Sequence, residues 1–190
     1  MGYTTEFEGR ISLSRSLTED EAYYITQFSK SRRMERNASI CQEFDDPVRE
    51  SVGFPIGIEG EFCVFNYGYD DRSVIDHNKP PSTQPGLWCQ WILSGDLTAL
   101  EWDGVEKFYS YFEWLIYIHD NILVKWGVTF TNEYYITYQG EETEDTGEIF
   151  VRDGFIIKIH TEDPDQSHEL KQIETNKNTK NTTKKTTTKK

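Results

Sequence analysis

Alternating apolar and polar residues open the chain and indicate an extended segment. One face would carry Tyr3, Thr5, Phe7, Ile11 and Leu13, and the other Thr4, Glu6, Glu8, Arg10 and Ser12. Successive side chains of a strand point to opposite faces of a sheet. The pattern therefore predicts a strand over residues 3–13 with one solvated face.

Two later segments carry apolar residues at helical spacing. Thr18 and Glu21 form a capping box ahead of the first stripe, which predicts a helix over residues 18–31. Asp103, with a glutamate three residues later, predicts the start of a longer helix. Its apolar stripe runs from Phe108 to Trp126 and ends before a glycine.

Short apolar and aromatic runs predict the remaining strands. They cover residues 61–65, 87–93, 98–102, 134–139, 148–152 and 155–160. The turn Ser94-Gly95-Asp96 predicts one hairpin, and Asp153-Gly154 predicts another of type I′. Because most neighbouring strands are close enough to pair as antiparallel hairpins, we expect an α+β domain. Its mostly antiparallel sheet of about six strands would be covered by two helices.

Two connections lack periodicity. Residues 37–60 are rich in proline and glycine, although Pro47 to Val52 is long enough for one helical turn. Residues 66–86 form a long loop, and loops of this length in compact domains are usually functional or mobile. This loop is therefore a candidate to close a binding site.

The C-terminal end differs in composition and charge. Residues 166–190 hold seven lysines and two glutamates, whereas residues 1–165 hold 13 basic and 31 acidic residues, a net charge of −18. A Thr/Lys/Asn-rich segment cannot bury enough apolar surface to fold, so we expect a single domain over 1–165 and a disordered tail over 166–190. The acidic domain would repel nucleic acid, while the basic tail would make weak, salt-sensitive contact with it.

The cysteines and the apolar runs of the sequence indicate the cellular compartment of the protein. The three cysteines, Cys41, Cys63 and Cys89, are widely spaced and contain no C-x-x-C pair, which favours neither a disulfide framework nor a zinc site. No apolar run is long enough to span a bilayer, so no membrane partner is expected. We expect a cytoplasmic protein, located in the host cytoplasm or the virion if the source is a virus.

Four cations lie within seven residues at the end of the first predicted helix and directly after it. They are Lys30, Arg32, Arg33 and Arg36. Arginine forks match the oxygens of phosphate or carboxylate, so the cluster is a candidate anion site. The alternative is that these residues pair with the domain's surplus carboxylates, such as Asp45 and Asp46.

The segment before the predicted central hairpin is aromatic on both faces. Trp88 and Gln90 would share one face, and Cys89 and Trp91 the other. One face would pack under the helices, while the other would line a cleft with Gln90 and Glu101 as its polar groups. The alternative is that the two tryptophans simply make contacts with the core and with the covering loop. Lys107, near the predicted helix start, is a further candidate ligand-binding residue.

The sequence contains no recognisable catalytic or metal-binding motif. Asp70, Asp71, Asp76 and His77 share one loop but match no ligand spacing for calcium or zinc. No nucleophile motif or glycine-rich phosphate loop occurs, so neither a cofactor nor a metal is implied.

Several runs of residues resemble a widespread set of uncharacterised bacterial and viral proteins. They are Met1 to Gly9 (MGYTTEFEG), Ser31 to Met34 (SRRM), Gln84 to Trp91 (QPGLWCQW) and Glu101 to Gly104 (EWDG). The resemblance implies a shared fold over most of residues 1 to about 155 and carries no established activity. The chain departs from the pattern at Val105, where a second glycine is expected, and over residues 62–72, which lack the glycine-rich character of the similar proteins.

Three hypotheses of function follow. The first is a non-catalytic binding or interaction protein for a small anionic ligand or an acidic protein segment. The second is an enzyme acting on a small phosphate-bearing substrate, with Glu101 or Asp103 as general base. The third is a structural or virion-associated protein tethered by its basic tail.

Overall fold

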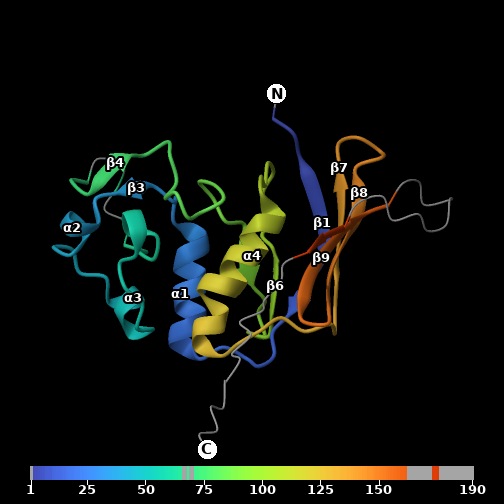
Figure 1. The fold of residues 1–190 in the computed structure, drawn as a ribbon, viewed down its shortest axis with the longest axis horizontal. Coiled ribbons are helices and arrows are strands. Elements are labelled where there is room, and N and C mark those ends of the chain that lie inside the picture. Colours follow the sequence, from blue (N-terminus) through green and yellow to red (C-terminus); the bar gives the residue numbers. More distant parts are fainter. Residues whose placement is uncertain (1, 66–67, 69–70, 162–172, 176–190) are drawn as a thin grey trace, which may run out of the picture.

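The computed structural model describes residues 2–65, 68, 71–161 and 173–175. Its helices are α1 (Glu19–Lys30), α2 (Ala38–Cys41), α3 (Pro47–Ser51) and α4 (Tyr111–Asn121), with two 3₁₀ turns, η1 (Ile58–Gly60) and η2 (Leu123–Trp126). Its strands are β1 (Thr5–Gly9), β2 (Ile11–Ser12), β3 (Glu35–Arg36), β4 (Val74–Asp76), β5 (Trp91–Leu93), β6 (Ala99–Trp102), β7 (Ile136–Gly140), β8 (Thr146–Arg152), β9 (Phe155–His160) and β10 (Ile173–Thr175). The fold is α+β, as predicted (Figure 1).

The described strands form three sheets rather than one. Five strands pair in the order β1-β7-β8-β9-β10, three in the order β2-β6-β5, and two as β3-β4. Every pairing between them is antiparallel, as predicted. β10 adds three residues of the predicted tail to the edge of the first sheet, and the rest of that tail, 166–172 and 176–190, lies outside the described residues.

The predicted strand over residues 3–13 is two strands in two sheets. Gly9, the last residue of β1, has φ 94°, and a Cβ at this position would collide with the carbonyl oxygen of Tyr135. Because of this bend β1 pairs with β7, whereas β2 pairs with β6. Beyond the bend the predicted solvated face is lost, since Ser12 is buried like its neighbour Ile11.

Helix α1 begins as its sequence predicts. Thr18 accepts from the backbone N–H of Glu21, and the Glu21 carboxylate accepts in return from the backbone N–H of Thr18. Arg15 adds a two-point ion pair to Glu21. These hydrogen bonds fix the start of the helix that carries Phe28 into the core.

The predicted longer helix begins seven residues later than expected, at Tyr111, with Ser110 at the cap position predicted for Asp103. Asp103 does not cap it, because its carboxylate accepts from the backbone N–H of Val105, two residues on, and closes a local turn. Lys107 and Ser110 then adopt left-handed conformations, with φ of 65° and 54°, which no helix permits. Residues 103–110 are therefore an irregular loop.

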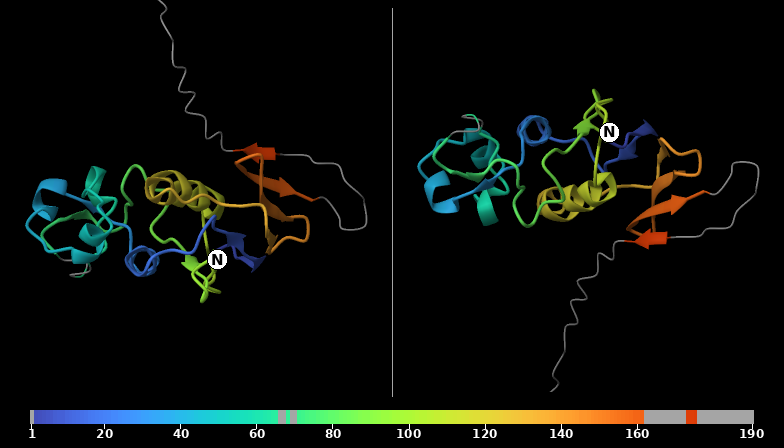
Figure 2. Two further views of the ribbon diagram at one scale, coloured as in Figure 1. Left: turned by 90° about the horizontal axis from the view of Figure 1, so that it is seen from below. Right: turned by 90° about the horizontal axis from the view of Figure 1, so that it is seen from above.

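Helices α1 and α4 lie side by side between the small lobe of β3, β4, α2 and α3 and the five-stranded sheet (Figures 1 and 2). Phe28 of α1 packs against Trp114 and Tyr117 of α4, with ring centroids 5.9 and 6.2 Å apart. Phe7 of β1 packs edge-on against Tyr111 at 4.7 Å. These aromatic contacts join the helices to the sheets through one core.

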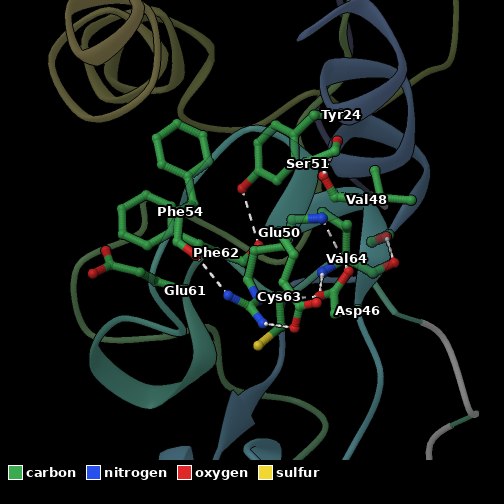
Figure 3. Close-up of polar contacts among 12 residues, drawn as sticks. Tyr24, Asp46, Val48, Glu50, Ser51, Phe54, Glu61, Phe62, Cys63 and Val64 are labelled. Atoms are coloured by element: carbon green, nitrogen blue, oxygen red, sulfur yellow. Dashed lines mark hydrogen bonds and ion pairs between the residues drawn. The ribbon is translucent and has the colours of Figure 1, made fainter. Parts of the chain in front are cut away.

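Residues 61–65 are not a strand, as they were predicted to be, but an irregular segment after η1. Buried side chains bond its backbone, and Tyr24 and Asp46 are two of them (Figure 3). Tyr24 donates from its hydroxyl to the carbonyl of Phe62 at 3.0 Å, and Asp46 accepts from the N–H of Val64 at 2.9 Å. Asp46 also caps α3, the helical turn predicted after it.

Candidate functional site

A cleft of about 900 Å³ opens between three parts of the chain. They are the end of α1, the segment leading into β5, and the loop 103–110. The lining residues are Ser29, Lys30, Gly86, Leu87, Trp88, Gln90, Ile92, Asp103, Val105, Glu106, Lys107 and Tyr109. Of the residues predicted to bind a ligand, the cleft brings together Trp88, Gln90 and Lys107.

The floor of the cleft is an extended segment with the alternation predicted from the sequence. Trp88, Gln90 and Ile92 face the cleft, whereas Cys89 and Trp91 are fully buried on the opposite side. Trp88 is 41% exposed, so the two tryptophans are not both core residues. The Leu87 carbonyl accepts from the N–H of Arg33 at 2.8 Å, which ties this segment to the chain after α1.

The loop 103–110 forms a wall that is anchored from behind. Phe108 is buried and packs edge-on against Trp91 and Phe7, with ring centroids 5.2 and 6.0 Å apart. On the same loop, which has left-handed residues at Lys107 and Ser110, Val105 and Tyr109 are 55% and 56% exposed. Two large apolar side chains are thus exposed on a loop that the buried Phe108 anchors to the core.

The chain's N-terminus lies against the same wall. A Cβ on Gly2 would stand 2.7 Å from the Tyr109 hydroxyl and 3.0 Å from the Lys107 side chain. Only glycine allows this approach without displacing Tyr109 or Lys107. The segment before β1 and the cleft wall are therefore in direct contact.

Charges in the cleft are balanced. Lys30 and Lys107 oppose Asp103 and Glu106, although residues 1–165 as a whole are strongly acidic. Burial raises the pKa of Asp103, and hydrogen bonds from the backbone of Val105 act against that rise. Gln90 donates to the carbonyl of Glu106 at 3.4 Å, and its own side-chain oxygen is shielded from solvent.

A smaller hollow of about 240 Å³ shares Lys30 and Trp88 with the cleft and continues toward Arg32. The Arg32 guanidinium lies 5.7 Å from the centre of the Trp88 ring. It donates to the carbonyl of His77 at 2.8 Å and to the side chain of Asn78 at 3.3 Å. The loop 66–86 thus contacts Arg32, and among its described residues only Gly86 lines the main cleft.

Arg33 is part of the framework, not of a solvent-facing anion site. Its side chain is buried and donates to the carbonyls of Glu61 at 2.6 Å and Cys63 at 3.1 Å, and to the side-chain oxygen of Gln84 at 3.1 Å. The guanidinium also lies 4.2 Å from the centre of the Phe28 ring. Burial lowers the pKa of Arg33, because desolvation disfavours its charge.

Arg36 is also buried, in the small lobe. It pairs with the carboxylate of Asp71 at 2.6 Å and donates to the hydroxyl of Ser73 at 2.6 Å. Both charged side chains are about 5% exposed or less. The expected pairing with a carboxylate is therefore found for Arg36, but with Asp71 in place of Asp45 or Asp46.

Glu101 lies apart from the cleft. It lines a separate hollow of about 580 Å³ together with Glu8, Arg10, Glu133, Tyr134 and others. Its strand partner Ile92 does line the cleft, so the two hollows are on the same side of the β2-β6-β5 sheet. Glu101 and Asp103, both considered as general bases, do not share a site.

The other residues that line the cleft were not predicted from the sequence to bind a ligand. Leu87, Ile92, Val105 and Tyr109 were assigned to strands or a helix, and their exposure depends on the conformation of the 103–110 loop. A hint was available in Val105, an apolar residue next to Gly104 in an otherwise polar turn.

The described residues contain neither a metal-binding group nor a membrane-spanning helix. Within the described ranges no group of three or more His, Cys, Asp or Glu side chains is placed to hold a metal ion. No helix among the described residues is both long and apolar enough to cross a bilayer.

Searches against protein-family models, curated proteins and solved structures found no match to this chain.

Proposed function

We propose that this chain is a non-catalytic binding protein whose cleft accepts a small amphipathic anion. The apolar body of the ligand would cover Trp88, Val105 and Tyr109, and its anionic group would lie at Lys30 and Lys107. The observation that carries the proposal is the convergence of three exposed, large apolar side chains on one cleft that also presents two lysines.

The dimensions and lining of the cleft suit a small molecule. Ligand pockets commonly measure about 300–1,000 Å³ and are mostly apolar with a few polar groups that orient the ligand. The cleft has about 900 Å³, and the surface that lines it is mostly apolar. A sugar phosphate, which lacks an apolar body, would leave that surface exposed to water.

The charge pattern favours an anion over a cation. The Asp103 carboxylate is engaged with the backbone of its own loop, whereas no hydrogen bond or ion pair to a side chain of the described residues occupies the ammonium groups of Lys30 and Lys107. Arg32 adds a further positive charge beside Trp88. An acidic peptide would meet the same cations but would extend beyond the cleft onto an acidic surface.

Replacing Trp88 by alanine is expected to weaken the binding of decanoate by about tenfold or more, because Trp88 supplies the largest apolar contact in the cleft. Decanoate provides an aliphatic body and a single carboxylate. Binding is measured by isothermal titration calorimetry on the full chain. Tyr23→Ala is the matched control, since Tyr23 is 55% exposed on α1 and lines none of the hollows described above.

The ligand panel separates the two parts of the proposal. Decanol tests the need for the anion, glucose 6-phosphate tests the need for the apolar body, and an acidic peptide tests the other class of ligand. Decanoate is expected to bind most tightly and Lys107→Gln to weaken only the charged ligands. Absence of decanoate binding at about 1 mM, or equal affinity in Trp88→Ala, would refute the proposal.

Binding of an anion is also expected to strengthen as the pH falls from neutral toward the raised folded pKa of Asp103. The folded pKa of Asp103 is raised, so this carboxylate takes up a proton at a higher pH than an exposed aspartate and removes a negative charge from the cleft. Anilinonaphthalene sulfonate is a suitable probe because its own charge does not change in this range. In Asp103→Asn the affinity should be higher at pH 7 and nearly independent of pH; an unchanged pH profile would contradict this role.

A further inference from the structure

The five-stranded sheet has an apolar outer face. Its inner face packs on the core through Ile149, Val151 and Ile156. Since side chains alternate along β8, Glu148, Phe150 and Arg152 point the other way. Their strand partners on β9 are Ile159, Ile157 and Phe155, respectively, and directly opposed residues share a face. Hydrophobic side chains therefore gather on the side that faces away from α4.

No described helix or strand layer covers this outer face (Figures 1 and 2). A sheet with one face in water normally carries polar residues there. Here Ile157 and Ile159 lie outside the core cluster but are only 9% exposed, so the apolar surface that remains open on this face is that of the partly buried Phe150 and Phe155. A hollow of about 530 Å³ beside them is lined by Phe150, Ile159, Tyr134, Tyr135 and others, none of which lines the ligand cleft.

The charges on β8 are self-complementary about a two-fold axis. Glu148 and Arg152 lie two residues on either side of Phe150 and share its face. The Arg152 guanidinium lies 5.0 Å from the centre of the Phe150 ring, so it extends over the face. Among the described residues neither Glu148 nor Arg152 makes an ion pair. A two-fold axis through Phe150 would place Glu148 against Arg152 of the partner subunit, and Arg152 against Glu148 of the partner subunit.

We propose that the outer face of β8 and β9 is the interface of a two-fold symmetric homodimer of this chain. Two-fold interfaces use the same patch on both subunits, and that patch must complement itself. An acidic and a basic group at equal distances from an apolar centre meet this condition. Two sheets packed face to face across the apolar stripe would bury Phe150 and the exposed Tyr135.

The test is the oligomeric state of the full chain by sedimentation velocity up to about 0.1 mM. The wild type should show a concentration-dependent dimer. Glu148→Arg and Arg152→Glu should each weaken dimerisation about 100-fold or more, because each places like charges in apposition. A mixture of the two variants should form a heterodimer, since the two basic side chains of one variant would then face the two acidic side chains of the other.

Two results overturn the proposal. One is a wild type that stays monomeric throughout, as expected if another segment of the same chain covers the face. The other is a dimer that neither charge reversal weakens, which would place the interface elsewhere. Circular dichroism of both variants verifies that they fold, and Lys125→Glu, a charge reversal outside this patch, should leave dimerisation unchanged.

Discussion

Arg33→Met is expected to destabilise the protein by about 3–5 kcal/mol, one of the two largest losses predicted for a single substitution. The guanidinium is buried and serves three acceptors, the carbonyls of Glu61 and Cys63 and the side-chain oxygen of Gln84. Methionine fills much of the space but donates no hydrogen bond. The Cys63 carbonyl and the Gln84 side-chain oxygen would then lose their donor in a site closed to water, whereas the Glu61 carbonyl keeps a hydrogen bond from the Gln84 amide at 2.7 Å. Each oxygen left without a partner costs about 1–3 kcal/mol.

The neighbouring residue supplies the control. Arg32→Met removes the same charge one position earlier, but Arg32 is less buried and its contacts face the surface, so a loss below about 1 kcal/mol is expected. Urea unfolding followed by circular dichroism measures both variants, with the midpoint falling and the slope unchanged. Equal losses at the two positions would show that Arg33 is not the framework residue described above.

Arg36→Met is expected to cost a similar amount, about 3–5 kcal/mol at neutral pH, for a different reason. It removes the only ion-pair partner of Asp71 found in the described part of the chain, and the Asp71 side chain is 4% exposed. An isolated carboxylate in that position keeps its desolvation penalty. The double variant Arg36→Met/Asp71→Leu should recover much of the loss, because no charge remains buried.

The pH dependence distinguishes this mechanism from simple loss of packing. Burial tends to raise the pKa of Asp71, but hydrogen bonds from Ser73 and Arg36 outweigh it and lower the folded pKa. The resulting stability is fully present above the unfolded pKa, about 3.9, and is lost as the pH falls through the folded pKa. In Arg36→Met burial should dominate, so acid should stabilise that variant relative to the wild type. A difference in unfolding free energy that stays constant from pH 7 to pH 3 would contradict this account.

Features set by near neighbours in sequence were predictable. The Thr18–Glu21 capping box involves residues three apart, and the structure contains both of its hydrogen bonds. Asp153 and Gly154, with φ of 52° and 78°, form the predicted tight turn between β8 and β9. In both cases the interacting groups lie within a few residues, so the local pattern determines the conformation.

Features that depend on contacts between residues far apart in the sequence were not predictable. Asp103 and the glutamate after it match a capping box as well as Thr18 and Glu21 do, yet the chain there is a loop. Phe108 is held by Phe7 and Trp91 from two other strands, and this packing outweighs the helical spacing of the segment. The division of the first strand at Gly9 likewise depends on the approach of Tyr135.

The candidate site shows the same limit. Trp88 and Gln90 were correctly predicted to lie together, because alternation along one strand fixes their shared face. Lys30, Arg32, Arg33 and Arg36 are close in sequence, but the role of each cation depends on which carbonyls and carboxylates it contacts in the fold. Arg33 and Arg36 find buried acceptors, whereas Lys30 remains exposed at the cleft. Only the three-dimensional arrangement separates the framework from the site.

The most direct test of the central claim is fluorine NMR of the full chain labelled with 5-fluorotryptophan and titrated with decanoate. Trp88→Phe assigns the Trp88 resonance, and Trp126, which packs against Phe54 at 5.3 Å, is the internal reference. The account predicts that the Trp88 resonance shifts saturably while that of Trp126 stays in place. A Trp88 resonance that does not move, while decanoate binds as measured by calorimetry, would contradict the assignment of the cleft as the ligand site.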